Sequence, residues 1–277
     1  MQLRSLGDAP TQTRVRLPDP DIPLRRIFPL HRLLETVRTK SMALVSPSIW
    51  DDPREDLAAL CMLDGHNVPT RRGQQQALSA YLAPTWGQCW SLNPGSDTLL
   101  RAYSRVVKDD TGRNSARDDE GVTVTTTVRH LLSASEGWHA AGADCHVLVG
   151  RVEYGDDKEN AQRIVNACSK HGPEFFRTVE GRTDQLLQKR AYFEHEQEVR
   201  LLMISRVNKH FGSVRHFDID PNTLFQSVSF DPRLAEGERR EREAELRDAG
   251  FIGPVVKDDS YQGALFQLLM DRDWVDP

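Results

Sequence analysis

The alternation of apolar and polar residues is clearest between Leu187 and Ile204, in the segment LQKRAYFEHEQEVRLLMI. Side chains two residues apart lie on the same face of a β-strand, so the second half of this segment predicts a strand with two distinct faces. One face would carry Gln197, Val199, Leu201 and Met203, and the other Glu196, Glu198, Arg200 and Leu202. The first face suits a hydrophobic core. The second face is either a solvated surface or part of a site.

The rest of the chain predicts a mixture of strands and helices. Short β-branched or aromatic runs indicate strands at Leu24–Leu30, Met42–Ser46, Trp86–Ser91, Val122–Thr126, Cys145–Tyr154, SVRHFDI and FQSVSF. Helical spacing indicates helices after Leu30, over Leu57–Leu63, in GQQQALSAYLAP, after Ser96, over Val128–Trp138, from Lys158 to Lys189 with a break at Gly172-Pro173, over Leu234–Ala249, and finally through Leu269. This mixed order favours an α+β fold with peripheral helices.

The first 23 residues differ in composition from the remainder. They contain Pro10, Pro18, Pro20 and Pro23 among polar residues, which favours a flexible N-terminal arm without regular structure. No internal repeat or Gly/Ser-rich linker divides the following residues, so 24–277 are predicted to form a single domain.

Composition narrows the class of protein without identifying it. The 277 residues are 28% charged and 38% hydrophobic, and the formal net charge is −5. These values are ordinary for a globular domain and argue against a broad basic surface for nucleic acid. The cysteines, Cys61, Cys89, Cys145 and Cys168, are widely spaced, which favours a reducing cytoplasm over a disulfide framework. No secretion signal or membrane span is predicted.

Several motifs recur in an order that resembles the bacterial family called domain of unknown function 2971. In sequence they are RRIFPL, LVSPSIWDDPRED, CWS followed by LLRAYS, VEYG, and the K-x-x-x-F-x-x-E-x-E-x-R pattern from Lys189 to Arg200. The resemblance covers most of the chain from about residue 24. Three positions depart mildly from the family pattern: Asp51 starts the D-D-P-R-E motif, Trp90 replaces phenylalanine, and Phe193 replaces tryptophan.

The layout of these motifs is also similar to that of ADP-ribosyltransferases. Those enzymes carry an arginine or histidine on a first strand, a serine with nearby aromatic residues on a middle strand and a glutamate, often in E-x-E, on a late strand. The positions here that match this pattern are Arg26 with Arg25 as the neighbouring alternative, Ser91, and Glu196 with Glu198. The resemblance implies a fold of two packed, mostly antiparallel sheets and an NAD-binding cleft.

The same resemblance implies roles for individual residues. The arginine would bind the pyrophosphate of NAD, because a guanidinium makes paired hydrogen bonds with phosphate oxygens. Glu198 would stabilise the positive charge that develops on the ribose as the nicotinamide bond breaks, and Glu196 would orient the acceptor. Ser91 would hold the glutamate, and Trp90 or Tyr103 would stack on the nicotinamide. Arg200 is a further candidate for cofactor binding.

The acceptor stays open at this point. Protein, nucleic acid, a small molecule and water are all compatible with the residues, giving a transferase or an NAD glycohydrolase. A role as a toxin or phage-defence effector follows only by analogy.

Two other functions use the same residues. Asp51, Asp52, Glu55, Glu196 and Glu198 could converge on Mg²⁺ in a nuclease or phosphoesterase, although Lys189, seven residues before Glu196, is at an awkward distance for such a site. Alternatively, the Glu/Arg face could be a salt-bridge network in a non-catalytic sensor or interaction module. The nine histidines show no metal-binding spacing, so no metal ligand set is predicted beyond the carboxylates of the nuclease alternative.

Overall fold

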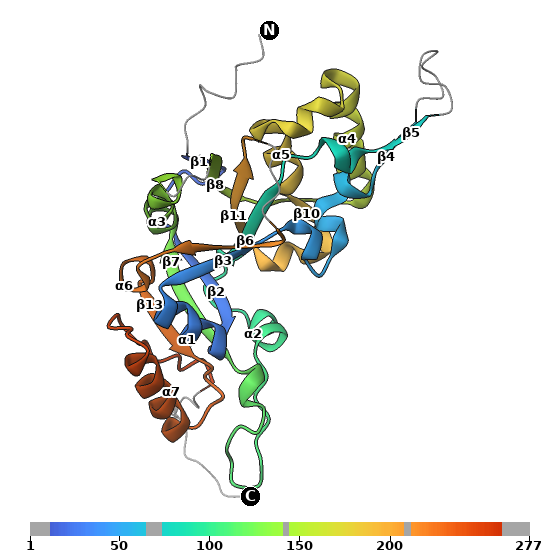
Figure 1. The fold of residues 1–277 in the computed structure, drawn as a ribbon. Helices are drawn as coiled ribbons and strands as arrows, with labels where there is room; N and C mark the ends of the chain where they lie inside the picture. The colour runs from blue at the N-terminus through green and yellow to red at the C-terminus, as the bar shows by residue number, and fades with distance from the viewer. Residues whose placement is uncertain (1–11, 65–73, 141–143, 208–211, 262–277) are drawn as a thin grey trace, which may run out of the picture.

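The computed structural model describes residues 12–64, 74–140, 144–207 and 212–261, which form a mixed α/β fold (Figure 1). The strands of the main sheet are β1 (Gln12–Val15), β2 (Pro23–Pro29), β3 (Ser41–Val45), β6 (Thr85–Ser91), β7 (Gly121–Thr127), β8 (Cys145–Arg151), β11 (Glu198–Ser205), β12 (Val214–Asp218) and β13 (Ser227–Phe230). Two small sheets pair β4 (Met62–Asp64) with β5 (Gln75–Ala77), and β9 (Glu153–Gly155) with β10 (Gln188–Arg190). The expected mixture of strands and helices is confirmed.

The main sheet forks at β6. Strand β6 pairs with β11 over most of its length, and its other edge pairs with β3 at Gly87 and with β2 at Ser91. From β11 the sheet continues to β8 and β1, from β2 to β7 and β13, and from β3 to β12. Neighbouring strands are antiparallel apart from β1 and β8, which run parallel. The expected antiparallel strands are therefore present, but as one forked sheet in place of two separate packed sheets.

The largest hydrophobic core joins the branches of the fork. It contains side chains from β2, β6, β7, β8 and β11, with Trp90 of β6 packed edge-on against Phe28 of β2 at 6.2 Å between ring centroids. Val199, Leu201 and Met203 of β11 enter this core, as their alternation predicts. Packing across the fork fixes the angle between the branches, because close-packed interiors resist small displacements.

The opposite face of β11 is covered as well. Leu202 and Ile204 pack with Leu186 and Leu187, at the end of helix α5 (Val179–Leu186), in a second core. All eight residues of β11 are buried. The interpretation of the Glu/Arg face as a solvated surface is therefore wrong, and Glu198 and Arg200 lie inside the protein.

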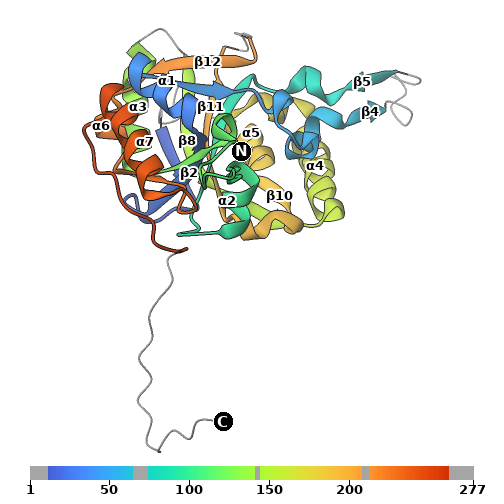
Figure 2. The ribbon, with the colours of Figure 1, turned by 90° about the horizontal axis from the view of Figure 1, so that it is seen from below.

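Helices stand on two sides of the sheet (Figures 1 and 2). Helices α1 (Leu30–Thr39), α6 (Pro221–Leu224) and α7 (Glu236–Asp248) lie on one side, and α4 (Asp157–His171) and α5 on the other. The remaining helices are α2 (Asp97–Tyr103) and α3 (Val128–Ala140). Ser96 caps helix α2, since its hydroxyl accepts from the Leu99 amide at 3.2 Å.

Three local predictions need correction. Residues 12–15 of the predicted flexible arm form strand β1, which pairs with β8, while residues 1–11 lie outside the described residues. The segment predicted as a helix in GQQQALSAYLAP forms β5 and one 3-10 turn, η4 (Leu78–Tyr81). The helix expected over Leu57–Leu63 is partly a 3-10 segment, η2 (Pro53–Leu60), which is followed by β4.

Two further predictions concern the last helix and membrane-spanning segments. The helix predicted through Leu269 lies outside the described residues. Within the described part of the chain, no helix is long and apolar enough to span a bilayer.

Candidate active site

A cleft of about 1410 Å³ opens at the fork of the sheet. It is bordered by β2, β6 and β7, by η2, by α2 and by the segment before β11. The sequence-predicted residues that line it are Arg25, Arg26, Trp90, Ser91, Tyr103, Glu196 and Glu198, together with Asp51 and Asp52 of the nuclease alternative. Arg200 is completely buried beside the cleft. The predicted residues thus converge on one region.

Three of these residues are direct neighbours across adjacent strands. Arg25 of β2 is paired with Ser91 of β6, and Ser91 is paired with Glu198 of β11. Paired residues place their side chains on the same face of a sheet, with Cβ atoms about 5 Å apart. Arg25, Ser91 and Glu198 therefore form a row across the sheet, on the face that borders the cleft.

Arg26 has a different position from Arg25. It is paired with Val124 of β7, which is completely buried in the core, so adjacent arginines of β2 leave opposite faces of the strand. Its Nη1 donates to the carbonyl of Cys89 at 2.5 Å, between the two points where β6 pairs with β2 and β3. Burial lowers the pKa of Arg26. Arg26 thus bonds the open edge of β6 inside the fork.

Ser91 positions the chain that leads into β11. Its hydroxyl donates to the carbonyl of Glu196 at 2.6 Å and accepts from the amide of Asn93 at 3.0 Å. The Asn93 side chain in turn donates to the carbonyl of His195 at 3.2 Å. Ser91 therefore holds the backbone just before Glu198, whereas the role predicted for it was to hold the glutamate itself.

Glu198 is buried and fully engaged by cations. Its Oε1 accepts from Nε of Arg200 at 2.7 Å, and its Oε2 accepts from Nζ of Lys189 at 2.8 Å. The backbone amide of Glu198 donates to the hydroxyl of Tyr154 at 2.7 Å. Burial opposes ionisation, but Arg200 and Lys189 outweigh it and lower the pKa of Glu198 to about 2. Glu198 is consequently a carboxylate throughout the neutral pH range.

Lys189 lies among three carboxylates. Its Nζ is 2.7 Å from Glu196, 2.8 Å from Glu198 and 3.2 Å from Glu55, and its side chain is only 6% exposed. The attraction of these carboxylates raises the pKa of Lys189 although burial opposes the charge. The judgement that Lys189 is too far along the chain from Glu196 is wrong, because the 3-10 segment η7 (Ala191–Glu196) turns the chain back.

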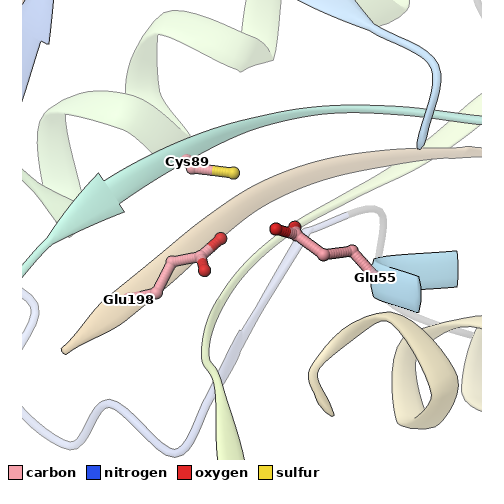
Figure 3. A group of neighbouring side chains, drawn as sticks. All are labelled: Glu55, Cys89 and Glu198. Carbon is pink, nitrogen blue, oxygen red and sulfur yellow. The ribbon is translucent and has the colours of Figure 1, made fainter. Parts of the chain in front are cut away.

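Glu55 reaches the site from η2. Its Oε2 accepts from Nη2 of Arg200 at 2.6 Å, and Figure 3 shows its carboxylate pointing toward that of Glu198. Oxygens of the two carboxylates and the thiol of Cys89 lie within 4.8 Å of one another. Burial and the neighbouring charge of Glu198 raise the pKa of Glu55 despite Arg200 and Lys189. The two carboxyl groups therefore have unequal affinities for a proton.

Trp90 and Tyr103, the two aromatic residues predicted to stack on the nicotinamide, lie in different environments. The side chain of Trp90 is 2% exposed and packs in the main core, so its predicted stacking role is wrong. Tyr103 is 56% exposed at the end of α2 and lines the cleft, where its ring is accessible. Trp50 also lines the cleft, and its ring lies 4.6 Å from the guanidinium carbon of Arg200.

The predicted magnesium ligands are engaged otherwise. Asp52 caps η2 by accepting from the amide of Arg54, and it also accepts from Nη2 of Arg190 at 2.7 Å. Asp51 is exposed. In the described part of the chain, the group with ligand spacing is Glu55, Cys89 and Glu198. A thiol does not suit Mg²⁺, and the two carboxylates already bind Lys189 and Arg200, so this group does not fit a magnesium centre.

The sequence predicted Glu55 only as a magnesium ligand of the nuclease alternative, and it predicted no role for Lys189, Cys89 or Tyr154. Lys189 had a signal, because K-x-x-x-F-x-x-E-x-E-x-R places it on the same segment as its partners. The expected convergence of Glu55 with Glu196 and Glu198 is present, but with Lys189 and Arg200 as the partners of these carboxylates. Cys89 and Tyr154 carried no comparable signal.

Comparisons with known proteins find few similarities. No protein-family model and no curated protein matches the chain. Solved structures that match are those of DarT from Thermus sp. 2.9 in complex with NAD+, with carba-NAD+ and with ADP-ribosylated ssDNA. Each match covers 87% of this chain and 96% of DarT, at 11% to 14% identity and TM-scores of 0.33 to 0.34. Similarity at this level establishes neither the fold nor the reaction of this chain.

Proposed function

We propose that the protein cleaves the bond between nicotinamide and ribose in NAD and transfers ADP-ribose to an acceptor or to water. The observation that carries this proposal is the row of Arg25, Ser91 and Glu198 on three neighbouring strands at the cleft. An arginine, a serine and a glutamate on successive strands form the residue set that the resemblance to ADP-ribosyltransferases implies. The row unites residues that are 66 and 107 positions apart in sequence.

The geometry suits the chemistry of this bond cleavage. Departure of neutral nicotinamide leaves positive charge on the ribose, which a fixed carboxylate stabilises. Glu198 is ionised and held by Arg200 and Lys189, so it needs little reorganisation when the charge develops. Glu198 lines the cleft, where its negative charge would face the ribose.

The charge of the cluster also favours a cationic reacting group. Glu55, Glu196 and Glu198 face two cations, Lys189 and Arg200, so one negative charge is left over when all five groups are ionised. At the other end of the row, Arg25 has the donors to bind the pyrophosphate in pairs. Tyr103, exposed at the rim, would stack on the nicotinamide ring.

The test is nicotinamide release from NAD by the purified protein. We expect release by wild type, loss of about 10²–10³ in rate for Glu198→Gln, and weaker NAD binding for Arg25→Ala. Calorimetric titration of Arg25→Ala and Arg26→Ala tells the two arginines apart, because Arg26 bonds the sheet edge. Absence of NAD binding and of release by folded wild type would contradict the proposal and favour the non-catalytic module. The acceptor and a role as a toxin or defence effector stay predictions.

A further inference from the structure

Two carboxyl groups face each other at the candidate site, and they come from unrelated parts of the chain (Figure 3). We propose that Glu55 is a further catalytic residue: the base that takes the proton from the acceptor as it attacks the ribose beside Glu198. This inference rests on the proposed function and adds a role that the E-x-E motif does not contain. In that motif Glu196 is the residue expected to orient the acceptor.

Glu55 faces Glu198 closely enough for both carboxylates to reach one acceptor atom. Oxygens of Glu55 and Glu198 lie within 4.8 Å, so one acceptor oxygen placed between them can reach both at hydrogen-bond distance. The Glu55 side chain is 12% exposed and lines the cleft, whereas Glu198 is 2% exposed. Glu55 is thus the more accessible of the facing pair.

Glu196 has a different set of contacts. Its carboxylate binds Lys189 at 2.7 Å, and its backbone carbonyl accepts from Ser91. Glu55 instead shares both Lys189 and Arg200 with Glu198. The cations that hold Glu198 therefore also fix the orientation of Glu55, which keeps a base in place without a separate support.

The two environments assign the two roles. Arg200 and Lys189 lower the pKa of Glu198 and keep it ionised, while burial and the charge of Glu198 raise the pKa of Glu55. Paired groups whose pKa values are pushed apart divide into a fixed charge and a proton acceptor. Glu198 is then the fixed charge, and Glu55 is the group that takes up a proton more readily.

The step balances as follows. The acceptor oxygen forms a bond to C1′ of the ribose while the C1′–N bond breaks, and nicotinamide leaves as a neutral molecule with the electron pair of that bond. The acceptor proton passes to Glu55 and then to solvent. With water as acceptor, the products are ADP-ribose, nicotinamide and one proton.

A nucleophile without a proton to lose provides a direct test. Wild type, Glu55→Ala, Glu55→Gln, Glu196→Ala and Glu198→Ala are incubated with NAD, with and without sodium azide. In water we expect the Glu55 variants to release nicotinamide about 10²–10⁴-fold more slowly than wild type, which is the usual contribution of a general base. Azide attacks C1′ without deprotonation, so it restores release in Glu55→Ala and yields ADP-ribosyl azide.

The other variants serve as references. Glu198→Ala is not restored by azide, because it lacks the fixed charge that stabilises the ribose, and Glu196→Ala keeps more activity than Glu55→Ala. The exposed Glu194→Ala on η7 leaves release unchanged. Glu55→Gln keeps the size of the side chain and an oxygen that accepts from Arg200, so it controls for a folding defect, and melting curves of all variants confirm the folded state.

The pH profile gives an independent readout. The wild-type rate falls as pH drops through the pKa of Glu55, and this limb disappears in Glu55→Gln. If Glu55→Gln released nicotinamide at the wild-type rate with an unchanged pH profile, the role of Glu55 as a base would be wrong, while the proposed function would stand. Rescue of Glu196→Ala by azide, with none for Glu55→Ala, would assign the base to Glu196 instead. Absence of release from wild type in water and in azide would overturn the proposed function and this inference together.

Discussion

Lys189 shows how one residue holds the candidate site together. Its ammonium contacts Glu55, Glu196 and Glu198, and its side chain is almost completely buried. The structure explains the pattern K-x-x-x-F-x-x-E-x-E-x-R. Segment η7 turns the chain back so that Lys189 contacts Glu196 and Glu198. The centroid of the Phe193 ring lies 4.8 Å from Nζ of Lys189. The residue types were visible in the sequence, but their closeness depends on this turn.

We predict that Lys189→Met destabilises the fold strongly. Removing one partner from a buried charge cluster leaves uncompensated charge, which typically costs about 3–5 kcal/mol. Here Glu55, Glu196 and Glu198 would all lose a cation. Denaturant unfolding measures the change, and the exposed Lys158→Met on α4 is the matched control, with a change of less than about 0.5 kcal/mol. Equal stabilities of the two variants would show that the cluster contributes little to folding.

The ionisation of Glu198 predicts a specific loss of stability in acid. Its pKa is about 2 in the folded protein against an ordinary value of 4.5, so the folded state favours the charged form. A lowered pKa stabilises the fold above about pH 4.5, and this contribution is lost as pH falls toward 2. At about 1.4 kcal/mol per pH unit of pKa difference, it amounts to about 3 kcal/mol.

The measurement compares wild type with Glu198→Gln, which cannot ionise. The stability advantage of wild type should shrink between pH 5 and pH 2. Glu55 acts in the opposite direction, because its pKa is raised and its neutral form is favoured by folding. A constant difference between the two proteins over this pH range would contradict the assignment of Glu198 as the low-pKa group.

At the scale of elements, the alternation of apolar and polar residues predicted strand β11, whereas the local sequence pattern predicted the wrong structure for GQQQALSAYLAP. Val199, Leu201 and Met203 face the main core as expected, but the opposite face is also buried because α5 covers Leu202 and Ile204. Whether a charged strand face is solvated depends on what packs over it, which periodicity does not encode. GQQQALSAYLAP has helical composition, yet it forms a strand and a 3-10 turn, since tertiary packing overrides a weak propensity.

The packing of α5 against the 3-10 segment η6 (Pro173–Arg177) can be tested at one glycine. A Cβ added at Gly181 would clash with the carbonyl oxygen of Phe175, which is backbone and cannot rotate away. We expect Gly181→Ala to destabilise the protein by about 1–3 kcal/mol, as other overpacking changes do. Lower Tm and lower denaturant midpoint are the measurements.

Gly237 in α7 is the matched control for this substitution. It is also helical, but a Cβ there meets nothing within 4 Å. Gly237→Ala should therefore be neutral or stabilise by up to about 1 kcal/mol, because alanine favours a helix over glycine. If both alanine variants behaved alike, the close contact between α5 and Phe175 would not be a feature of the folded protein.

At the scale of the molecule, the cleft exists because the sheet forks at β6. The pairing of Arg25 with Ser91 and of Ser91 with Glu198 joins three distant segments, and only the register of the strands makes them neighbours. The sequence predicted the individual strands and named all three residues. It could not predict which arginine of β2 joins the row, because shifting a strand by one residue exchanges its two faces.

The last prediction separates NAD cleavage from metal-dependent hydrolysis at the level of the whole protein. A nuclease needs a divalent ion to stabilise phosphoryl oxygens, with carboxylates free to bind it. Here the carboxylates bind Lys189 and Arg200, and Asp52 binds Arg190 while capping η2. Breaking the nicotinamide bond requires no metal ion. The cleft should therefore respond to NAD and be indifferent to Mg²⁺.

We accordingly expect nicotinamide release to survive excess EDTA, and Asp51→Asn and Asp52→Asn to reduce it much less than Glu198→Gln. NAD at one hundred times its Kd should raise the free energy of unfolding by about 2.7 kcal/mol through preferential binding to the native state, and so raise the Tm, whereas Mg²⁺ should not. Asp52→Asn also removes the ion pair with Arg190, so a small effect of this variant would show that release does not depend on that pair. Complete loss of activity in EDTA with recovery in Mg²⁺ or Mn²⁺ would favour the hydrolase, because an ion could then compete with Lys189 for the carboxylates of Glu55 and Glu198.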